Sequence, residues 1–181
     1  IRNGTFSRFM VIPTNPQLTF MAQNFGAGGY YALFAILAAV ISIALFGVQP
    51  ILNHEILSLI CALMMIPLGL LFMVSYQFFI GVLTFKFQDI TVFWYLQRNI
   101  IALATGTLFP LSLLPETAIY ALRFLPFTYV TYTPAMLITG QLRWQEGLFG
   151  FVVLAVWTAV MLCLSCITYN RLRVKYDGVG I

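Results

Sequence analysis

Residue types that perform chemistry are few in this sequence, and their spacing excludes most enzymatic sites. The single histidine, His54, stands beside Glu55, and no second histidine follows at the spacing of a zinc-binding helix. Cys163 and Cys166 have a C-x-x-C spacing, but both lie within an apolar run, where the spacing only places two small residues on one helix face. No nucleophile, base and orienting residue occur together, so the sequence predicts no catalytic and no metal site.

Phosphate-binding chemistry is absent from the sequence as well. No G-x-x-x-x-G-K-[ST] motif occurs, and the glycine-rich stretch Gly26–Gly29 lacks the lysine and the preceding strand that a P-loop needs. We therefore expect no cofactor in this chain, and any dependence on ATP and Mg²⁺ must come from a partner ATPase.

One charged residue lies well inside an apolar run. Arg98 stands there between Gln97 and Asn99, whereas the five acidic residues lie at the ends of such runs or between them. Ion-coupled carriers usually keep acids inside their spans, so this distribution disfavours a secondary transporter. Two interpretations of the polar triplet stay open: it lines a cavity or faces a partner subunit, or it lies at the cytoplasmic membrane interface.

The composition sets the class of protein. The 181 residues are 61% hydrophobic and only 8% charged, against about 25% charged residues in soluble domains. So few charges cannot cover a water-soluble surface, and we predict an all-α integral membrane protein. The net charge is +4, but the basic residues are not clustered as in a nucleic-acid-binding protein. We therefore expect their distribution to indicate the orientation of the chain in the lipid bilayer.

Four stretches are long and apolar enough to cross a bilayer, which takes about 20 helical residues. They are residues 28–48, 56–85, 91–109 and 147–169. The predicted organisation is one membrane domain with a cytoplasmic region at 1–27, three spans within 28–109, an outer segment at 110–146, the last span at 147–169 and a cytoplasmic tail at 170–181. Lysine and arginine are concentrated on the side that holds both ends, which places both ends in the cytoplasm.

The outer segment is apolar but rich in proline. Proline is tolerated in the first turn of a helix and breaks its interior, so Pro115 and Pro134 are predicted to begin short helices, while Pro126 and Gly140 end them. An irregular turn at residues 126–133 would join the two helices. Each helix is too short to span a bilayer, which leaves a re-entrant hairpin and a loop on the outer membrane surface as open alternatives.

These residues resemble a known family. The span ending in GTLFP, followed by LLPETAIYALRFLPFTYVTYTPAMLITGQL, is similar to permease subunits of ABC-2-type exporters, and most similar to six-span ABC-2 permeases of uncharacterised function. IRNGTFSRFMVIP at residues 1–13 resembles their cytoplasmic stretch after the second span, with Met10 where the pattern has leucine. RVKYDGVG at residues 173–180 resembles their C-terminal ending.

The resemblance implies an architecture. The four spans would be the last four of six, with residues missing before Ile1, and the segment at 110–146 would be an outer re-entrant helical hairpin. Residues of that hairpin are Pro110, Pro115, Pro126, Phe127, Pro134 and Gly140. The span at 91–109 would line the translocation path through Gln97, Arg98, Asn99 and Thr105.

The resemblance also implies a coupling element near the start of the chain. Its residues would be Arg2, Gly4, Phe6, Arg8, Phe9 and Pro13, docked on a cytosolic ABC ATPase. Taken without the resemblance, a solvated loop is the alternative for residues 1–27.

The predicted function is therefore a permease subunit of an ATP-driven exporter, without an ATPase site of its own. It would form half of the path in a bacterial plasma membrane, with a second permease subunit as partner in a homodimer or heterodimer. The alternatives are a membrane scaffold or sensor that transports nothing, and a secondary transporter.

Overall fold

The computed structural model describes residues 15–47, 53–83, 86–87, 91–104 and 122–172, together with the isolated positions 115, 117 and 120. Within these residues the chain is helical and contains no strand, which confirms the all-α prediction. The helices are α2 Pro16–Phe46, α3 Ile56–Val82, α4 Thr91–Ala104, α6 Phe127–Val130, α7 Tyr132–Ile138 and α8 Trp144–Leu172.

Three of these helices, α2, α3 and α8, are long and apolar enough to cross a membrane, with 31, 27 and 29 residues. They correspond to three of the four predicted spans. The predicted span at 91–109 is described as helix α4 as far as Ala104, and its remainder lies outside the described residues. The count of four spans therefore stays a prediction.

Helix α2 begins at Pro16 and not at residue 28, where the sequence analysis placed the start of the first span. Asn15 caps the helix: its side chain accepts a hydrogen bond from the backbone N–H of Gln17 at 3.0 Å, and Pro16 occupies the first turn. Both residues favour helix initiation at this point. The residues that follow Pro16 are partly polar, so the apolar runs in the sequence do not indicate this first part of the helix.

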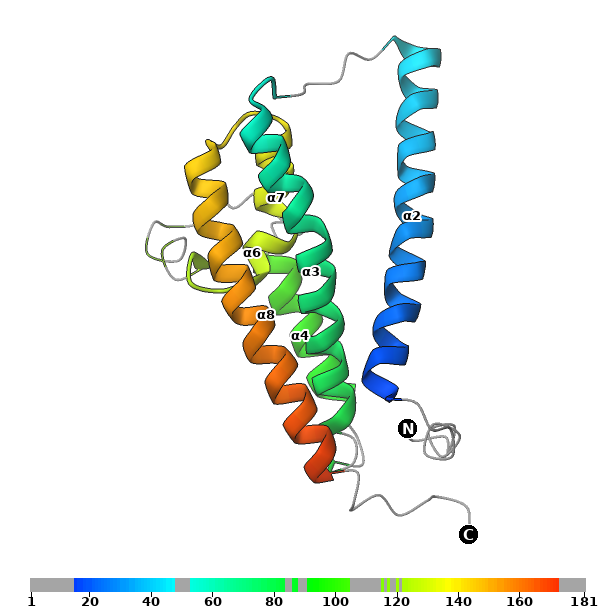
Figure 1. Ribbon diagram of the computed structural model, residues 1–181, viewed down its shortest axis with the longest axis vertical. Helices are drawn as coiled ribbons and strands as arrows, with labels where there is room; N and C mark the ends of the chain where they lie inside the picture. The colour runs from blue at the N-terminus through cyan, green and yellow to red at the C-terminus, as the bar shows by residue number, and fades with distance from the viewer. Residues whose placement is uncertain are drawn as a thin grey trace.

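Helices α3 and α8 form the centre of the fold and begin at the same end of it (Figure 1). Each presents buried residues at intervals of three or four positions, the spacing that keeps one helix face against a neighbour. On α3 this face comprises Ser58, Ala62, Met65, Gly69 and Phe72. On α8 it comprises Gly147, Gly150, Leu154, Thr158 and Ser165. Many of these residues are small, as is usual where membrane helices approach closely.

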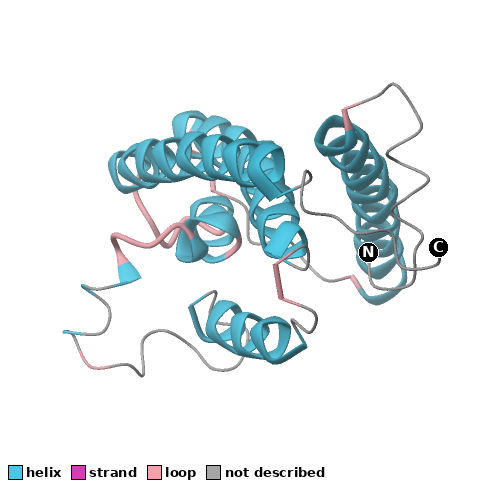
Figure 2. Ribbon diagram, turned by 90° about the horizontal axis from the view of Figure 1, so that it is seen from below, coloured by secondary structure: helices cyan, strands magenta, loops and turns pink. Residues whose placement is uncertain are grey.

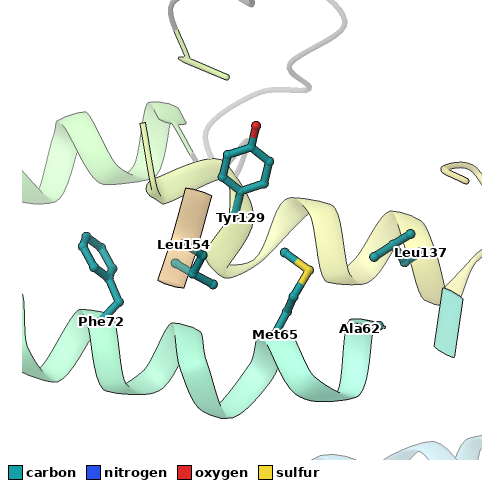
Figure 3. Packing of buried hydrophobic residues seen from close by; sticks show 6 residues of the cluster. All are labelled: Ala62, Met65, Phe72, Tyr129, Leu137 and Leu154. Atoms are coloured by element: carbon teal, nitrogen blue, oxygen red, sulfur yellow. The ribbon is translucent and has the colours of Figure 1, made fainter. Parts of the chain in front are cut away.

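The short helices α6 and α7 pack against this pair and complete its core. Tyr129 of α6 and Leu137 of α7 are buried together with residues of α3 and α8, and Figure 3 shows these side chains gathered between the helices. Figures 1 and 2 both show α2 set apart along most of its length. Only Pro16 and Gln17 of α2 are buried.

Glycines on the central helices make room for α6 and α7. A methyl group added to Gly150 would lie 2.5 Å from Cδ1 of Tyr129, and one added to Gly147 would lie 2.8 Å from Cδ1 of Leu137. A methyl group added to Gly69 of α3 would lie 3.4 Å from Cα of Val130, which is an ordinary van der Waals contact. The short helices therefore lie in contact with the backbones of α3 and α8.

We predict that Gly150→Ala destabilises the full-length protein by about 1–3 kcal/mol, because the added methyl group overlaps the ring of Tyr129. The midpoint of thermal unfolding in detergent, followed by size-exclusion chromatography, measures the effect. Gly29→Ala on α2 is the matched control, since a methyl group there meets nothing within 4 Å. An equal midpoint for the two variants would contradict the packing described.

Candidate functional site

The predicted functional residues fall into three groups, of which the structure describes two. The coupling residues Arg2, Gly4, Phe6, Arg8, Phe9 and Pro13 lie outside the described residues, as do Thr105 of the path and Pro110 of the hairpin. The polar triplet on α4 and most of the outer segment from Arg123 onward can be examined. Among the residues described, no group of three His, Cys, Asp or Glu side chains could hold a metal ion.

Helix α4 divides the polar triplet between different environments. Gln97 is buried, with 8% of its surface exposed, and its side-chain oxygen has no hydrogen-bond partner within the described part of the chain. Arg98 and Asn99 are exposed. Successive helical residues point about 100° apart, so three in a row cannot share one face. Arg98 lies about 10 Å along the helix from Thr91.

The outer segment is helical where the sequence analysis expected an irregular turn. Residues 127–130 form α6 and residues 132–138 form α7, so the predicted turn at 126–133 is wrong. α7 begins at Tyr132, and Pro134 is its third residue and not its first. This position costs no hydrogen bond, because backbone N–H groups of the first helical turn have no partner within the helix.

The predicted end of the second helix at Gly140 is confirmed. Gly140 follows α7 with a φ of 74°, a left-handed conformation that favours glycine and ends the helix. Pro126 precedes α6 and is fully buried, and Phe127 packs its ring against Phe72 and Tyr76 of α3 at centroid distances of 5.8 and 5.7 Å. Pro115 is exposed, and the helix predicted to begin there lies largely outside the described residues.

The outer segment reaches far along the central helices. Its inner end contacts Phe72, which lies about 24 Å along α3 from Ile56 at 1.5 Å per residue. Its other end is fixed beside the turn that precedes α3. There the backbone N–H of Asn53 donates to the carbonyl of Ile138 at 2.7 Å, and the side-chain amide of Asn53 donates to the carbonyl of Leu137 at 3.1 Å.

Asn53 has a further role as an acceptor. Its side-chain oxygen accepts a hydrogen bond from the backbone N–H of Glu55 at 3.0 Å, next to the start of α3. One side chain thus serves both the end of α7 and the beginning of α3. These contacts bring the turn before α3 and the end of α7 together at one end of the bundle.

A second polar connection joins α2 to the opposite end of the bundle. The side-chain amide of Gln17 donates to the hydroxyl of Ser165 on α8 at 2.7 Å, and both residues are buried. Beside it, Phe78 of α3 lies between Phe20 and Tyr169, with ring centroids 6.0 and 5.7 Å apart. Gln17 is not among the residues predicted to be functional, because residues 1–27 are predicted to form a cytoplasmic region and not part of a helix that contacts α8.

The turn before α6 is held by two aromatic side chains. The hydroxyl of Tyr129 donates to the carbonyl of Arg123 at 2.7 Å, and the indole N–H of Trp157 on α8 donates to the carbonyl of Phe124 at 2.9 Å. The sequence carries only a weak signal for these residues, an aromatic side chain with a hydrogen-bond donor within an apolar helix.

The comparisons with known proteins agree with the resemblance seen in the sequence. A family model described as ABC-2 family transporter protein matches residues 1–180. No curated protein and no solved structure matches the chain.

We predict that Asn53→Ala lowers the free energy of unfolding by about 1–2 kcal/mol, because it removes one hydrogen bond to Leu137 and the acceptor for Glu55. Thermal unfolding of the full-length protein measures this change. Asn24→Ala is the matched control, since the Asn24 side chain is exposed and bonds only within α2, to the carbonyl of Phe20. A loss as large in the control would rule out a special role for Asn53.

Proposed function

The chain belongs to the ABC-2 transporter family and is a multi-pass membrane permease component, and we propose that it forms half of the translocation path of an ATP-driven exporter. The other half would come from a second permease subunit, identical or different. The four spans of this chain would be the last four of six in a bacterial plasma membrane. ATP and Mg²⁺ would bind to cytosolic ABC ATPase subunits.

The polar triplet supports a path along α4. Helices α2 and α3 contain no charged residue, whereas α4 carries Arg98 in its interior, flanked by Gln97 and Asn99. A charged side chain inside a bilayer is costly unless it faces water or a polar partner. We therefore assign the exposed Arg98 and Asn99, with Thr105, to the surface that substrate passes, and place the buried Gln97 next to that surface.

The contacts of the outer segment support a re-entrant hairpin over this path. Its inner end lies about 24 Å along α3, and the hydrocarbon core of a bilayer is roughly 30 Å thick. A loop on the membrane surface would not bury Tyr129 and Leu137 between two spanning helices. The hairpin residues Pro115, Pro126, Phe127, Pro134 and Gly140, with Pro110, would then close the outer side of the path.

The basic residues support cytoplasmic ends for this chain. Lys86 follows α3 and Arg171 lies in the last turn of α8, both at the end of the bundle where these helices finish. Excess Lys and Arg marks the cytoplasmic side of a membrane protein. That end also receives the start of α2, which the coupling residues precede directly in the sequence.

Coupling to ATP hydrolysis would run from residues 1–13 into the bundle through α2. The coupling residues are Arg2, Gly4, Phe6, Arg8, Phe9 and Pro13. The buried hydrogen bond between Gln17 and Ser165 connects the first turn of α2 to α8. Gln17 follows the last coupling residue, Pro13, by only four positions. A movement of the coupling element would therefore be transmitted to α8 through a short stretch of chain.

Association with an ATPase tests the proposed function. We expect an ABC ATPase to co-purify with the full-length protein, and Arg8→Glu to weaken this association about tenfold by removing a charged contact at the docking surface. Arg143→Glu, at the opposite end of the bundle, is the control and should leave the association unchanged. Pull-down with quantified ATPase measures both variants. The proposal fails if no ATPase co-purifies and no candidate ATPase changes its activity on reconstitution.

The hydrogen bond from α2 to α8 gives a separate test of coupling. Gln17→Leu keeps the volume of the side chain but removes the bond to Ser165, so we expect ATP hydrolysis by the reconstituted complex to fall about fivefold while assembly is retained. Gln23→Leu, at an exposed position of α2, is the control. Equal hydrolysis rates for the two variants would show that Gln17 plays no part in coupling.

A further inference from the structure

The turn at Arg123–Pro126 lies level with the middle of α8. Trp157, which contacts it, is about 20 Å along α8 from Trp144 and stands at the centre of the apolar stretch 147–169. At this level a backbone carbonyl without a hydrogen bond costs several kcal/mol, because hydrocarbon offers no donor. The inner tip of the outer segment is therefore stable only where donors meet its carbonyls.

Three carbonyls of this tip have donors, as does the carbonyl of Leu122 just before it. The carbonyls of Leu122 and Pro126 accept from the backbone N–H groups of Leu125 and Tyr129, both within the segment. The carbonyl of Arg123 accepts from the Tyr129 hydroxyl, which is also local. The bond to Phe124 differs in kind, because its donor, Trp157, belongs to a spanning helix 33 positions away in the chain.

Two residues on one face of α8 hold the tip in place. Gly150 and Trp157 are seven positions apart, close to two helical turns, and so lie on the same face. The ring of Tyr129 packs against the backbone at Gly150, which directs its hydroxyl toward Arg123, while Trp157 meets the next carbonyl. The position of the tip is thus determined by α8.

The side chain of Arg123 indicates what surrounds the tip. It is exposed, and its guanidinium group lies 5.4 Å from the ring centroid of the exposed Tyr120. A positive charge at the level of mid-span is stable next to water and costly next to lipid. The backbone of Arg123 is held at this level, so a position of the side chain in water is favoured over one in lipid.

We propose that Trp157 is a positioning residue that holds the inner tip, Arg123–Pro126, at the middle of the membrane, with Arg123 in the water of the path. This inference rests on the proposed function, because it assigns the tip to the export path. Breaking the single bond from Trp157 would free the tip from α8 and leave its local hydrogen bonds intact.

Thiol labelling of the full-length permease tests the proposal in membrane vesicles without the ATPase. Cys61, Cys163 and Cys166 are replaced by alanine, Arg123→Cys is introduced, and its reaction with a membrane-impermeant methanethiosulfonate is timed. We expect labelling at residue 123, and we expect Trp157→Phe to accelerate it about fivefold because the tip loses its bond to α8. Trp144→Phe, at the start of α8, is the control and should leave the rate unchanged.

Each outcome decides one part of the proposal. If residue 123 stays unlabelled in every variant, Arg123 does not face water. If labelling proceeds at one rate with and without the indole N–H, Trp157 does not position the tip. If Trp157→Phe fails to fold, Trp157→Met, which fills the site with a long apolar side chain but also lacks the donor, must accelerate labelling instead. Failure to find an ATPase partner would leave these rates interpretable, so the two proposals fail separately.

Discussion

Backbone hydrogen bonding away from water is the constraint on which the rest of this structure depends. The long helices α2, α3 and α8 satisfy it internally, since each N–H meets a carbonyl one turn earlier. The segment at 122–143 cannot, because it changes direction repeatedly between short helices. Residues outside the segment donate hydrogen bonds to its carbonyls: Asn53, next to the start of α3, at one end, and Trp157 of α8 at the other. The path of the segment is therefore determined by the hydrogen-bond donors and the glycine positions on or next to α3 and α8.

The two ends of the bundle are connected in different ways. At the end where α3 and α8 begin, Asn53 joins the turn before α3 to the end of α7. At the opposite end, α2 is attached through the buried pair Gln17 and Ser165 and a small aromatic cluster, while most of its surface is exposed. An alternating-access transporter needs rigid packed elements and connections between them that can rearrange. In the proposed exporter the central pair with α6 and α7 would provide the former, and the attachment of α2 would provide the latter.

The placement of polar residues links this architecture to transport. Helices α2 and α3 carry no charge, whereas α4 carries Arg98 in its interior and the inner tip carries Arg123. Both belong to elements that the proposed path would pass. Polar side chains elsewhere, such as Ser75 and Thr158, bond to the carbonyl one turn earlier in their own helix and add no polar surface. Among the described residues, Arg98 and Arg123 would thus offer charged groups to water and substrate along the proposed route.

The sequence by itself determined the class of protein, three spanning helices, the end of α7 at Gly140 and the family, because these follow from long apolar runs, from a glycine that must adopt positive φ and from motif order. It did not determine that α2 begins at Pro16, since the capping by Asn15 acts on a polar stretch that hydropathy assigns to a loop. Nor did it determine that residues 127–130, 132 and 133 are helical, since an irregular turn was predicted at 126–133. Helices of four and seven residues are unstable alone, and contacts with α3 and α8 stabilise them, including the close approach to Gly147 and Gly150. The role of Trp157 also depends on the tertiary structure. Its hydrogen-bond partner, the carbonyl of Phe124, lies 33 positions away in the chain, and only the fold brings the two together.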